Sequence, residues 1–267
     1  MSAVLFLFLA HLGVGIAGSL LLVSRAAGVG FFRFNAGLGS FLLLTALAVR
    51  PALPDAALPD RIALIALVLA TGALLVYWAT IGRVLARLRP LWLGLAVAGG
   101  ATTLVAQATI WSAAEMGPPA LALTLASFVS SAALLGGTCT AMILGHWYLV
   151  LPSMDVGLLK RVVRFHFGSA LLRIVVVGLV VAAALASWQS PGGVGFDRYA
   201  LSIEGVFLWQ RVLFGLAGPV VLAYLTWETA KIQSTQSATG ILYVDFFAVI
   251  VGEMLAKYLL VSQRVPL

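Results

Sequence analysis

Charged residues are scarce in this sequence, and their scarcity excludes an ordinary water-soluble protein. Only 9% of the 267 residues are Asp, Glu, Lys or Arg, whereas a soluble domain carries about 25%. Hydrophobic residues make up 62% of the chain, and they form long unbroken runs. A membrane β-barrel would instead show alternating segments of about ten residues. The sequence therefore predicts an all-α integral membrane protein.

Cysteine and the common catalytic motifs are also missing. The single cysteine, Cys139, excludes an internal disulfide and a cysteine-ligated iron–sulfur cluster. Because it lies in an apolar run, we expect a buried structural thiol. There is no Walker P-loop, no H-E-x-x-H and no G-x-S-x-G. These absences disfavour a self-contained ATP-driven pump, a zinc protease and a serine hydrolase. We expect no metal site, and whether the protein is an enzyme stays open.

The formal net charge of +7 is not gathered into a basic tail or a soluble domain. The basic residues lie mostly in short loops between apolar runs, where they set the orientation of a membrane protein. We therefore expect membrane lipids as partners and no nucleic acid. The N-terminal stretch M-S-A-V-L-F-L-F-L-A-H-L lacks a basic region before its apolar run, so it is expected to be a retained helix rather than a cleaved signal.

Eight segments are long and apolar enough to cross a bilayer, which takes about 20 residues each. No soluble domain or internal repeat interrupts them, so residues 1–267 are expected to form one polytopic transmembrane domain. The fifth segment is longer than a straight span requires. It is expected to tilt, to break near Gly136 and Gly137, or to extend beyond the membrane. The segments cover about residues 3–24, 30–49, 61–82, 91–113, 118–151, 165–188, 203–226 and 239–261.

The basic residues are divided unequally between the two sets of loops. The positive-inside rule places the richer set in the cytoplasm. Both termini are then predicted on the outer, periplasmic side of a bacterial inner membrane. The loops after odd-numbered segments hold Arg25, Arg33, Arg83, Arg87, Arg89, Lys160, Arg161, Arg164 and Lys231, whereas the other loops and the tail hold Arg50, Arg61, Arg198 and Arg264.

Ionisable residues lie deep inside three of the apolar segments: Arg173, Arg211, Asp245, Glu253 and Lys257. Each such charge costs roughly 2.5–3.5 kcal/mol on insertion scales, so it is rarely present without a partner or a role. Spacings of eight and four put the last three on one helical face. We expect Arg211 to pair with Glu253 across adjacent antiparallel helices. Two interpretations stay open: charges paired for insertion, with Lys257 reaching outward, or a polar stripe along a proton or ligand pathway.

The three histidines are candidates for haem or quinone binding. His146 and His166 lie near the cytoplasmic ends of adjacent segments, so one bis-His b-type haem is conceivable. Their aromatic neighbours favour an interfacial belt or a structural hydrogen bond instead. His11, in the outer half, could bind a quinone carbonyl. Arg173 follows His166 by seven residues on roughly the same face, which predicts a second polar site of His146, His166, Arg173 and Asp245.

Small residues and one proline indicate how the segments pack. Five segments carry glycine-rich stretches, among them G-V-G-I-A-G-S, G-G-T and G-L-A-G-P. Such stretches permit close contact between membrane helices. Pro219 is expected to kink its helix and to free a backbone carbonyl near the middle of the membrane.

In size and topology the chain resembles the membrane-anchor subunits of the dimethyl sulfoxide reductase and polysulfide reductase type. Those are eight-helix, cofactor-poor proteins with both termini outside, which bind a quinol and pass its electrons to an iron–sulfur partner. The resemblance covers the architecture of most of the chain and includes no diagnostic motif. It implies an integral membrane subunit of a multi-protein electron-transfer complex, with His11, Arg211 and Glu253 near a bound quinone.

Two further functions fit the same sequence. A proton- or ion-coupled transporter or channel would use His11 and the charged residues Arg211, Asp245, Glu253 and Lys257 as its pathway. A structural subunit would pack against lipids and other proteins without any chemistry. Quinone is the cofactor expected from the first function, with b-type haem as an alternative.

Overall fold

The protein is a bundle of helices, seen here in a computed structural model. The model describes residues 1–52, 58–83, 86–112, 119–151, 154–188, 193, 195–203 and 205–267. All regular elements in these residues are helical, as the sequence predicts. They are α1 (Ser2–Leu20), η1 (Arg25–Ala27), α2 (Gly28–Ala48), α3 (Leu58–Thr80), η2 (Ala86–Leu88), α4 (Arg89–Trp111), α5 (Ala120–Val150), α6 (Gly157–Ser187), α7 (Phe196–Ala200), α8 (Val206–Val212), η4 (Leu213–Ala217), α9 (Gly218–Lys231) and α10 (Thr235–Gln263).

Seven helical segments of the described chain are long and apolar enough to cross a membrane. The protein is therefore a multi-pass membrane protein. The last predicted segment is helix α10, which has 29 residues and packs along α9 and α5. The seven segments are Ser2–Leu20, Arg25–Ala48, Leu58–Thr80, Arg89–Trp111, Ala120–Val150, Gly157–Ser187 and Val206–Lys231.

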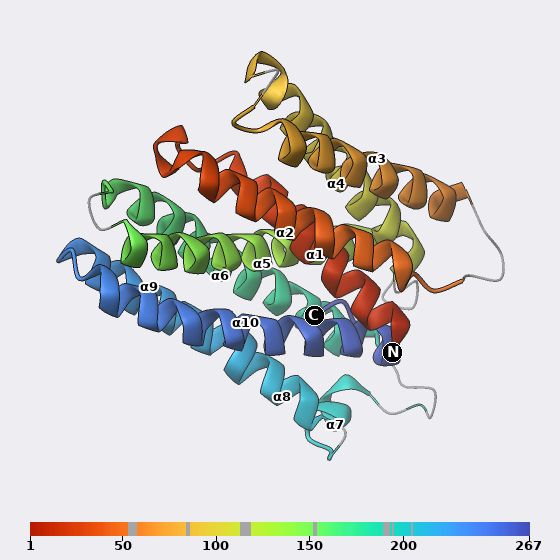
Figure 1. Cartoon of the computed structure of the whole chain (residues 1–267). Coiled ribbons are helices and arrows are strands. Elements are labelled where there is room, and N and C mark those ends of the chain that lie inside the picture. Colours follow the sequence, from red (N-terminus) through yellow and green to blue (C-terminus); the bar gives the residue numbers. More distant parts are fainter. Residues whose placement is uncertain are drawn as a thin grey trace.

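Helices α1 and α5 form the centre of the bundle (Figure 1). Helix α1 packs against α2, α4, α5 and α10, and 83% of its apolar stretch is buried. The α3–α4 pair lies along one edge, and α8 and α9 lie at the opposite edge. Helix α10 ends near the N-terminus of the chain, and the C-terminal residues turn back into the bundle (Figure 1). The elements around α1 and α5 are therefore the ones that can bring buried polar groups together.

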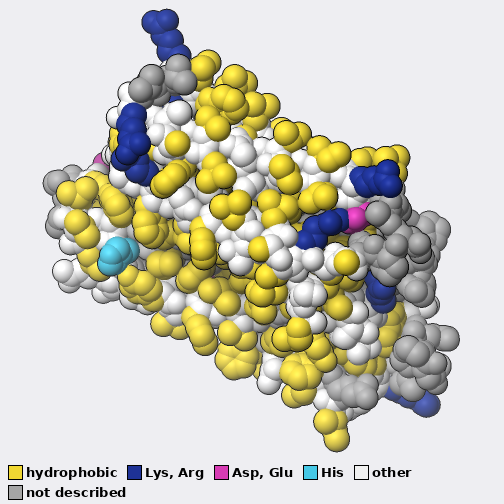
Figure 2. Space-filling model, turned by 45° about the vertical axis from the view of Figure 1, so that its right-hand side comes forward, with side chains coloured by type: hydrophobic (Ala, Val, Ile, Leu, Met, Phe, Trp, Pro, Cys, Tyr) yellow, Lys and Arg dark blue, Asp and Glu magenta, His cyan; other side chains and the backbone are white. Residues whose placement is uncertain are grey.

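The outer surface is suited to lipid rather than water. Figure 2 shows one face covered by hydrophobic side chains across its middle, with Lys and Arg gathered toward its ends. Large exposed side chains on this kind of surface include Phe41, Leu69, Val175 and Phe247. Without water in the bilayer core, only such side chains can face outward at low cost.

Glycines hold α1 and α5 in backbone contact, which is the kind of close packing that the glycine-rich stretches predict. A Cβ atom on Gly136 would lie 2.0 Å from the carbonyl carbon of Gly15, and one on Gly15 would lie 2.0 Å from the carbonyl oxygen of Ala132. Helix α5 runs without interruption through Gly136 and Gly137. Of the three alternatives for this long segment, the break at these glycines is wrong, because Gly136 serves a helix crossing rather than a bend.

Two segments differ from the predicted boundaries. Helix α6 begins at Gly157, earlier than the predicted start at residue 165, so it includes the basic turns before His166. The segment before Lys231 is not uniform, because it contains a π-helical turn, η4, between α8 and α9. The turn precedes Pro219, which is the residue expected to disturb this helix.

Candidate functional site

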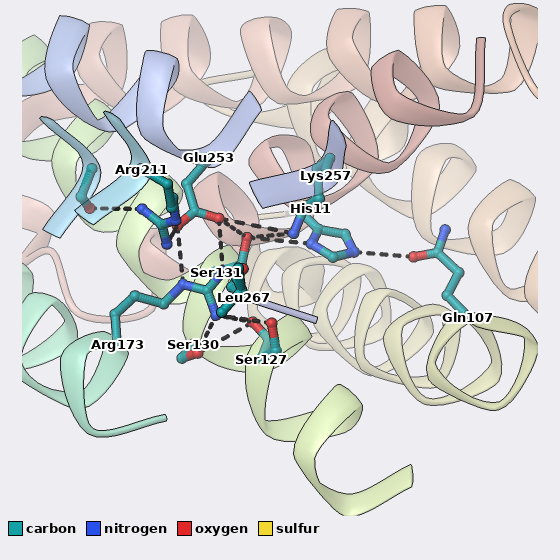
Figure 3. Close-up of polar contacts among 11 residues, drawn as sticks. His11, Gln107, Ser127, Ser130, Ser131, Arg173, Arg211, Glu253, Lys257 and Leu267 are labelled. Carbon is teal, nitrogen blue, oxygen red and sulfur yellow. Dashed lines mark hydrogen bonds and ion pairs between the residues drawn. The ribbon is translucent and has the colours of Figure 1, made fainter. Parts of the chain in front are cut away.

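The buried ionisable residues meet in one place, called here the central polar cluster (Figure 3). Helices α1, α4, α5, α6, α8 and α10 each contribute to it. Its charged members are buried from solvent and lipid, including Lys257 at 1% exposure. These charges therefore face other protein groups, as the rarity of unpartnered charges in apolar segments predicts. The cluster comprises His11, Gln107, Ser127, Ser130, Ser131, Arg173, Arg211, Glu253 and Lys257.

Glu253 is the centre of the cluster. Its Oε1 accepts hydrogen bonds from Arg211 Nη2 at 2.7 Å and from Arg173 Nε at 3.0 Å. Its Oε2 accepts from the Ser131 hydroxyl at 2.5 Å and from Arg173 Nη2 at 3.2 Å. Lys257 Nζ lies 3.8 Å from the same oxygen. The predicted pairs of Glu253 with Arg211 and Lys257 are confirmed, and both carboxylate oxygens have donors, as a buried charge requires.

Arg173 joins this carboxylate to helix α5 and to the end of the chain. Its Nη1 donates to the Ser127 carbonyl and hydroxyl at 3.0 and 2.9 Å, and to the Ser130 hydroxyl at 3.2 Å. Its Nη2 also donates to the main-chain oxygen of Leu267 at 2.8 Å. Grouping Arg173 with His146 and His166 was therefore wrong. Seven residues are two helical turns, about 10 Å along the axis, which separates Arg173 from His166 although they share a face.

Arg211 binds both the Glu253 carboxylate and a backbone carbonyl that Pro219 leaves without its usual donor. Proline has no N–H, so the carbonyl of Gly215, four residues earlier, loses its intrahelical donor. Arg211 Nη1 donates to that carbonyl at 2.8 Å while Nη2 binds Glu253. The predicted free carbonyl is thus confirmed, and a guanidinium satisfies it.

A glycine contact makes room for this arginine. A Cβ atom on Gly252 would lie 2.1 Å from Gly215 Cα, and one on Gly215 would lie 2.2 Å from Arg211 Nη1. The backbones of η4 and α10 therefore touch beside the guanidinium. Only glycine at both positions lets α10 approach closely enough for Arg211 to reach Glu253.

Replacing Arg211 with Lys is expected to destabilise the protein by about 1–3 kcal/mol. An ammonium cannot present two parallel donors, so either Glu253 or the Gly215 carbonyl loses its partner in a buried site. Thermal unfolding of the detergent-solubilised protein would measure the loss. Arg161→Lys is the control, because Arg161 is exposed on α6. Equal stability of the two variants would contradict the role assigned to Arg211.

A hydrogen-bonded chain leads from the carboxylate toward α4. Lys257 Nζ donates to the Ser131 hydroxyl at 2.8 Å and lies 5.2 Å from the centre of the Phe128 ring. His11 Nδ1 lies 3.4 Å from the same hydroxyl, and His11 Nε2 lies 3.3 Å from Gln107 Oε1. The expectation that Lys257 reaches outward was wrong, because its ammonium is held inside by a hydroxyl and an aromatic face.

A small cavity lies beyond Gln107, near the protein surface. It has a volume of about 10 Å³ and is lined by Arg50, Asp60 and Gln107 together with apolar side chains. Arg50 and Asp60 form an ion pair there. The Gln107 amide nitrogen has no partner among the described residues. A volume of this size is close to the minimum for one water molecule, and Gln107 lines the same cavity as this part-buried ion pair.

Asp245 does not join the central polar cluster, although it shares a helix face with Glu253. Its Oδ2 lies 2.6 Å from His166 Nε2, and Thr138 Oγ1 lies 3.2 Å from the same nitrogen. His166 and Asp245 are fully buried. The other ring nitrogen and the other carboxylate oxygen have no partner in the described residues. Asp245 therefore forms a second polar site with His166, as predicted, and it does not contact Arg211 or Glu253 in the described contacts.

His146 is separate from both sites. It is exposed near the end of α5, and its Nδ1 lies 2.7 Å from the Tyr243 hydroxyl. His166 is instead engaged by Asp245. The two rings thus have different partners, and haem binding between them stays a prediction.

Some members of the cluster were missed from the sequence. Gln107 and the serines were passed over because a hydroxyl or amide in an apolar run carries little weight by itself. The spacing of the serines is a signal that could have been used, because Ser130 and Ser131 follow Ser127 by three and four residues. That spacing puts all three on one face of α5.

Neither metal-ligating side chains among the described residues nor similarity to known proteins indicates what this site does. Among the described residues there is no group of three or more His, Cys, Asp or Glu side chains that could hold a metal ion. No protein-family model matches the chain, and no curated protein matches its sequence. The chemistry of the site is therefore argued from its own geometry, which offers hydrogen-bonded titratable groups.

Proposed function

We propose that the chain is a proton-coupled membrane protein in which the central polar cluster carries protons between the outer surface and Glu253. The observation that supports this most directly is the unbroken series of side chains from Glu253 through Ser131 and His11 to Gln107. Intramembrane ionisable groups in such chains are typical of proton relays. The groups pack directly against one another, which suits proton movement better than the binding of a large substrate.

The proposed topology has eight crossings, with α10 as the eighth. A helix of its 29 residues is longer than the hydrocarbon core of a bilayer is thick. Helix α10 ends near the N-terminus of α1, which agrees with an even number of crossings (Figure 1). From the distribution of Lys and Arg, we place both termini on the periplasmic side of a bacterial inner membrane. The Arg50–Asp60 pair then lies on the outer side.

His11 is the proposed proton carrier, because it lies between the polar surface and the charged centre. Its two ring nitrogens face different partners, Gln107 and Ser131. A histidine can accept a proton on one nitrogen and release one from the other. Ser131 contacts His11, Lys257 and Glu253. A proton leaving His11 toward Ser131 therefore reaches the group that Glu253 and Lys257 share.

The second polar site extends the proposed pathway toward the other side. His166 precedes Arg173 by seven residues, and Asp245 precedes Glu253 by eight. Thr138 follows Ser131 by seven on the antiparallel helix α5. These spacings place the two sites about 10–12 Å apart along the same three helices. The buried nitrogen of His166 and oxygen of Asp245 that have no partner among the described residues are where we expect water to continue the path.

Replacing His11 with Gln is expected to lower proton flux by about 100-fold while the protein stays folded. Gln keeps hydrogen-bonding capacity but cannot take up a proton, and positioned acid–base groups contribute about 10²–10⁴-fold. The measurement is the uptake of protons into liposomes that contain the purified protein, driven by an imposed potential. His146→Gln is the matched control, since His146 is exposed near the end of α5 and lies outside the central polar cluster. Wild-type flux no greater than that of empty liposomes would reject the proposal, as would equal flux through the two variants.

A quinol-oxidising subunit of an electron-transfer complex is the second candidate. Quinol oxidation releases protons, and a path that ends at the outer surface would carry them away. The Gln107–His11–Ser131 series leads from such a surface to the buried centre. An absorption spectrum and the quinone content of the protein purified with its native partners would test this candidate. Bound quinone together with a redox partner would favour it over a transporter.

A further inference from the structure

A larger cavity lies at the end of the bundle opposite the Arg50–Asp60 pair and apart from the central polar cluster. Its volume is about 320 Å³, which is within the range of ligand pockets in proteins. Helices α1 and α3 end beside it, and α2 and α4 begin there. The lining residues are Leu20, Leu21, Val23, Arg25, Gly28, Val29, Phe32, Tyr77, Ile81, Arg89, Pro90 and Leu93.

The charge of this cavity is entirely positive. Arg25 and Arg89 line it, and none of its lining residues is acidic. Neither arginine forms an ion pair with another described residue. The Nε of Arg89 is buried and has no hydrogen-bond partner in the described part of the chain. A buried guanidinium nitrogen without an acceptor is costly, so an external acceptor is expected.

Two helix starts add to the positive potential. Helix α2 begins at Gly28 and α4 at Arg89, and neither has a side-chain cap. The N-terminus of a helix carries a partial positive charge and unpaired N–H groups, which favour anions. At the nearby end of α3 the opposite partial charge is offset, because Arg33 Nη2 donates to the Ile81 carbonyl at 2.5 Å.

The rest of the lining is apolar. Leu20, Val29, Phe32 and Leu93 face the cavity from three different helices. Leu21 and Val29 are 55% and 44% exposed, so the apolar part of the lining is not closed over by other side chains. The occupant must therefore combine an anionic group with a hydrocarbon part.

We propose that this cavity binds the phosphate headgroup of an anionic phospholipid, with an acyl chain lying along Val29 and Phe32. Basic pockets between membrane helices are suited to such headgroups. Arg25 and Arg89 supply the charge-assisted hydrogen bonds to phosphate oxygens. The proposal is independent of proton transfer, because none of the lining residues belongs to the central polar cluster.

Lipid binding to the purified full-length protein in a neutral detergent tests the proposal. Native mass spectrometry would count bound phosphatidylglycerol and phosphatidylcholine at equal concentrations, and inorganic phosphate alone would serve as a separate arm. We expect phosphatidylglycerol to bind at least tenfold more tightly than phosphatidylcholine, since each of the two arginines near an anionic headgroup contributes about a factor of five. Inorganic phosphate is expected to bind far more weakly, because it lacks the hydrocarbon part.

The variants separate local binding from overall charge. Arg25→Gln with Arg89→Gln is expected to abolish the preference for phosphatidylglycerol. Arg83→Gln with Arg161→Gln removes the same charge from exposed positions outside the cavity and should keep it. Val29→Trp fills the cavity without changing charge and should lower binding of both lipids. Equal binding of the two lipids by the wild type, equal loss in both arginine pairs, or phosphate binding as tight as phosphatidylglycerol would each overturn the assignment.

Discussion

Replacing Glu253 with Ala is expected to cost about 3–5 kcal/mol of stability, the largest effect of any single change of charge in the chain. The substitution leaves Arg173, Arg211 and Lys257 buried without a carboxylate. Removing one partner of a buried ionic network is far more damaging than replacing the whole network, because the remaining charges stay desolvated. We expect little folded protein in the membrane and a strongly lowered midpoint of thermal unfolding in detergent.

Glu228→Ala is the control for this substitution. Glu228 forms an ion pair with Lys231 at 2.6 Å, but both side chains are more than 40% exposed. Exposed pairs of this kind contribute about 0–1 kcal/mol, so the control should unfold close to the wild type. If the Glu253 and Glu228 variants lost similar stability, the central polar cluster would not be the structural centre described here.

A milder substitution separates stability from chemistry at the same position. Gln at residue 253 keeps an oxygen that can accept from Arg211, so its cost should be lower than that of Ala. It still cannot carry a negative charge, and under the proposed function its proton flux should fall. Folded Glu253→Gln protein with unchanged flux would leave Glu253 as a structural counter-ion only.

The sequence predicts much of this architecture because hydrophobic length is a strong signal. Runs of about 20 apolar residues must be helical in a bilayer, where each backbone group needs an internal partner. The pair of Arg211 and Glu253 was also predictable, since two charges at similar depth on adjacent helices seldom stay apart. Helix ends were less predictable. Helix α6 extends into the basic residues before His166 because a helix can continue beyond the apolar run that predicts it.

The partition of the charges into two sites was not predictable from a helical face alone. Asp245 and Glu253 share a helix face, yet they bind different residues of α6. Asp245 contacts His166, and Glu253 contacts Arg173 two turns further along that helix. The relative shift of two neighbouring helices along their axes determines which of their residues face each other. That shift depends on contacts such as the one between Gly15 and Gly136. A sequence shows that the glycines are present, but it does not show which of the 27 meet.

The contribution of Gln107 and the serines shows a related difficulty. A hydroxyl in a membrane helix usually bonds to the carbonyl of the preceding turn, as Thr71 does to Leu67. Ser131 instead donates to a carboxylate on another helix. The two situations look the same in a sequence. Only the packing of α5 against α10 distinguishes them.

Replacing Gly15 with Ala is expected to destabilise the bundle by about 1–3 kcal/mol and to displace the proposed proton path at the same time. The new methyl group would lie 2.0 Å from the carbonyl oxygen of Ala132. That oxygen belongs to the backbone and cannot turn aside, so α1 and α5 must separate. His11 lies one turn before Gly15, and Ser131 is adjacent to Ala132. The 3.4 Å contact between His11 and Ser131 is therefore expected to lengthen beyond hydrogen-bonding distance.

Gly18→Ala is the matched control on the same helix, because a Cβ atom there would meet nothing within 4 Å. Alanine also has the higher helix propensity, so this variant should be as stable as the wild type or slightly more stable. Thermal unfolding in detergent and proton uptake by liposomes should both separate the two variants. Gly15→Ala protein that is folded but has lost flux would show that the α1–α5 contact positions the relay. If Gly15→Ala matched Gly18→Ala in both measurements, the α1–α5 backbone contact would not be important for stability. The claim that this contact positions His11 against Ser131 would then be rejected as well.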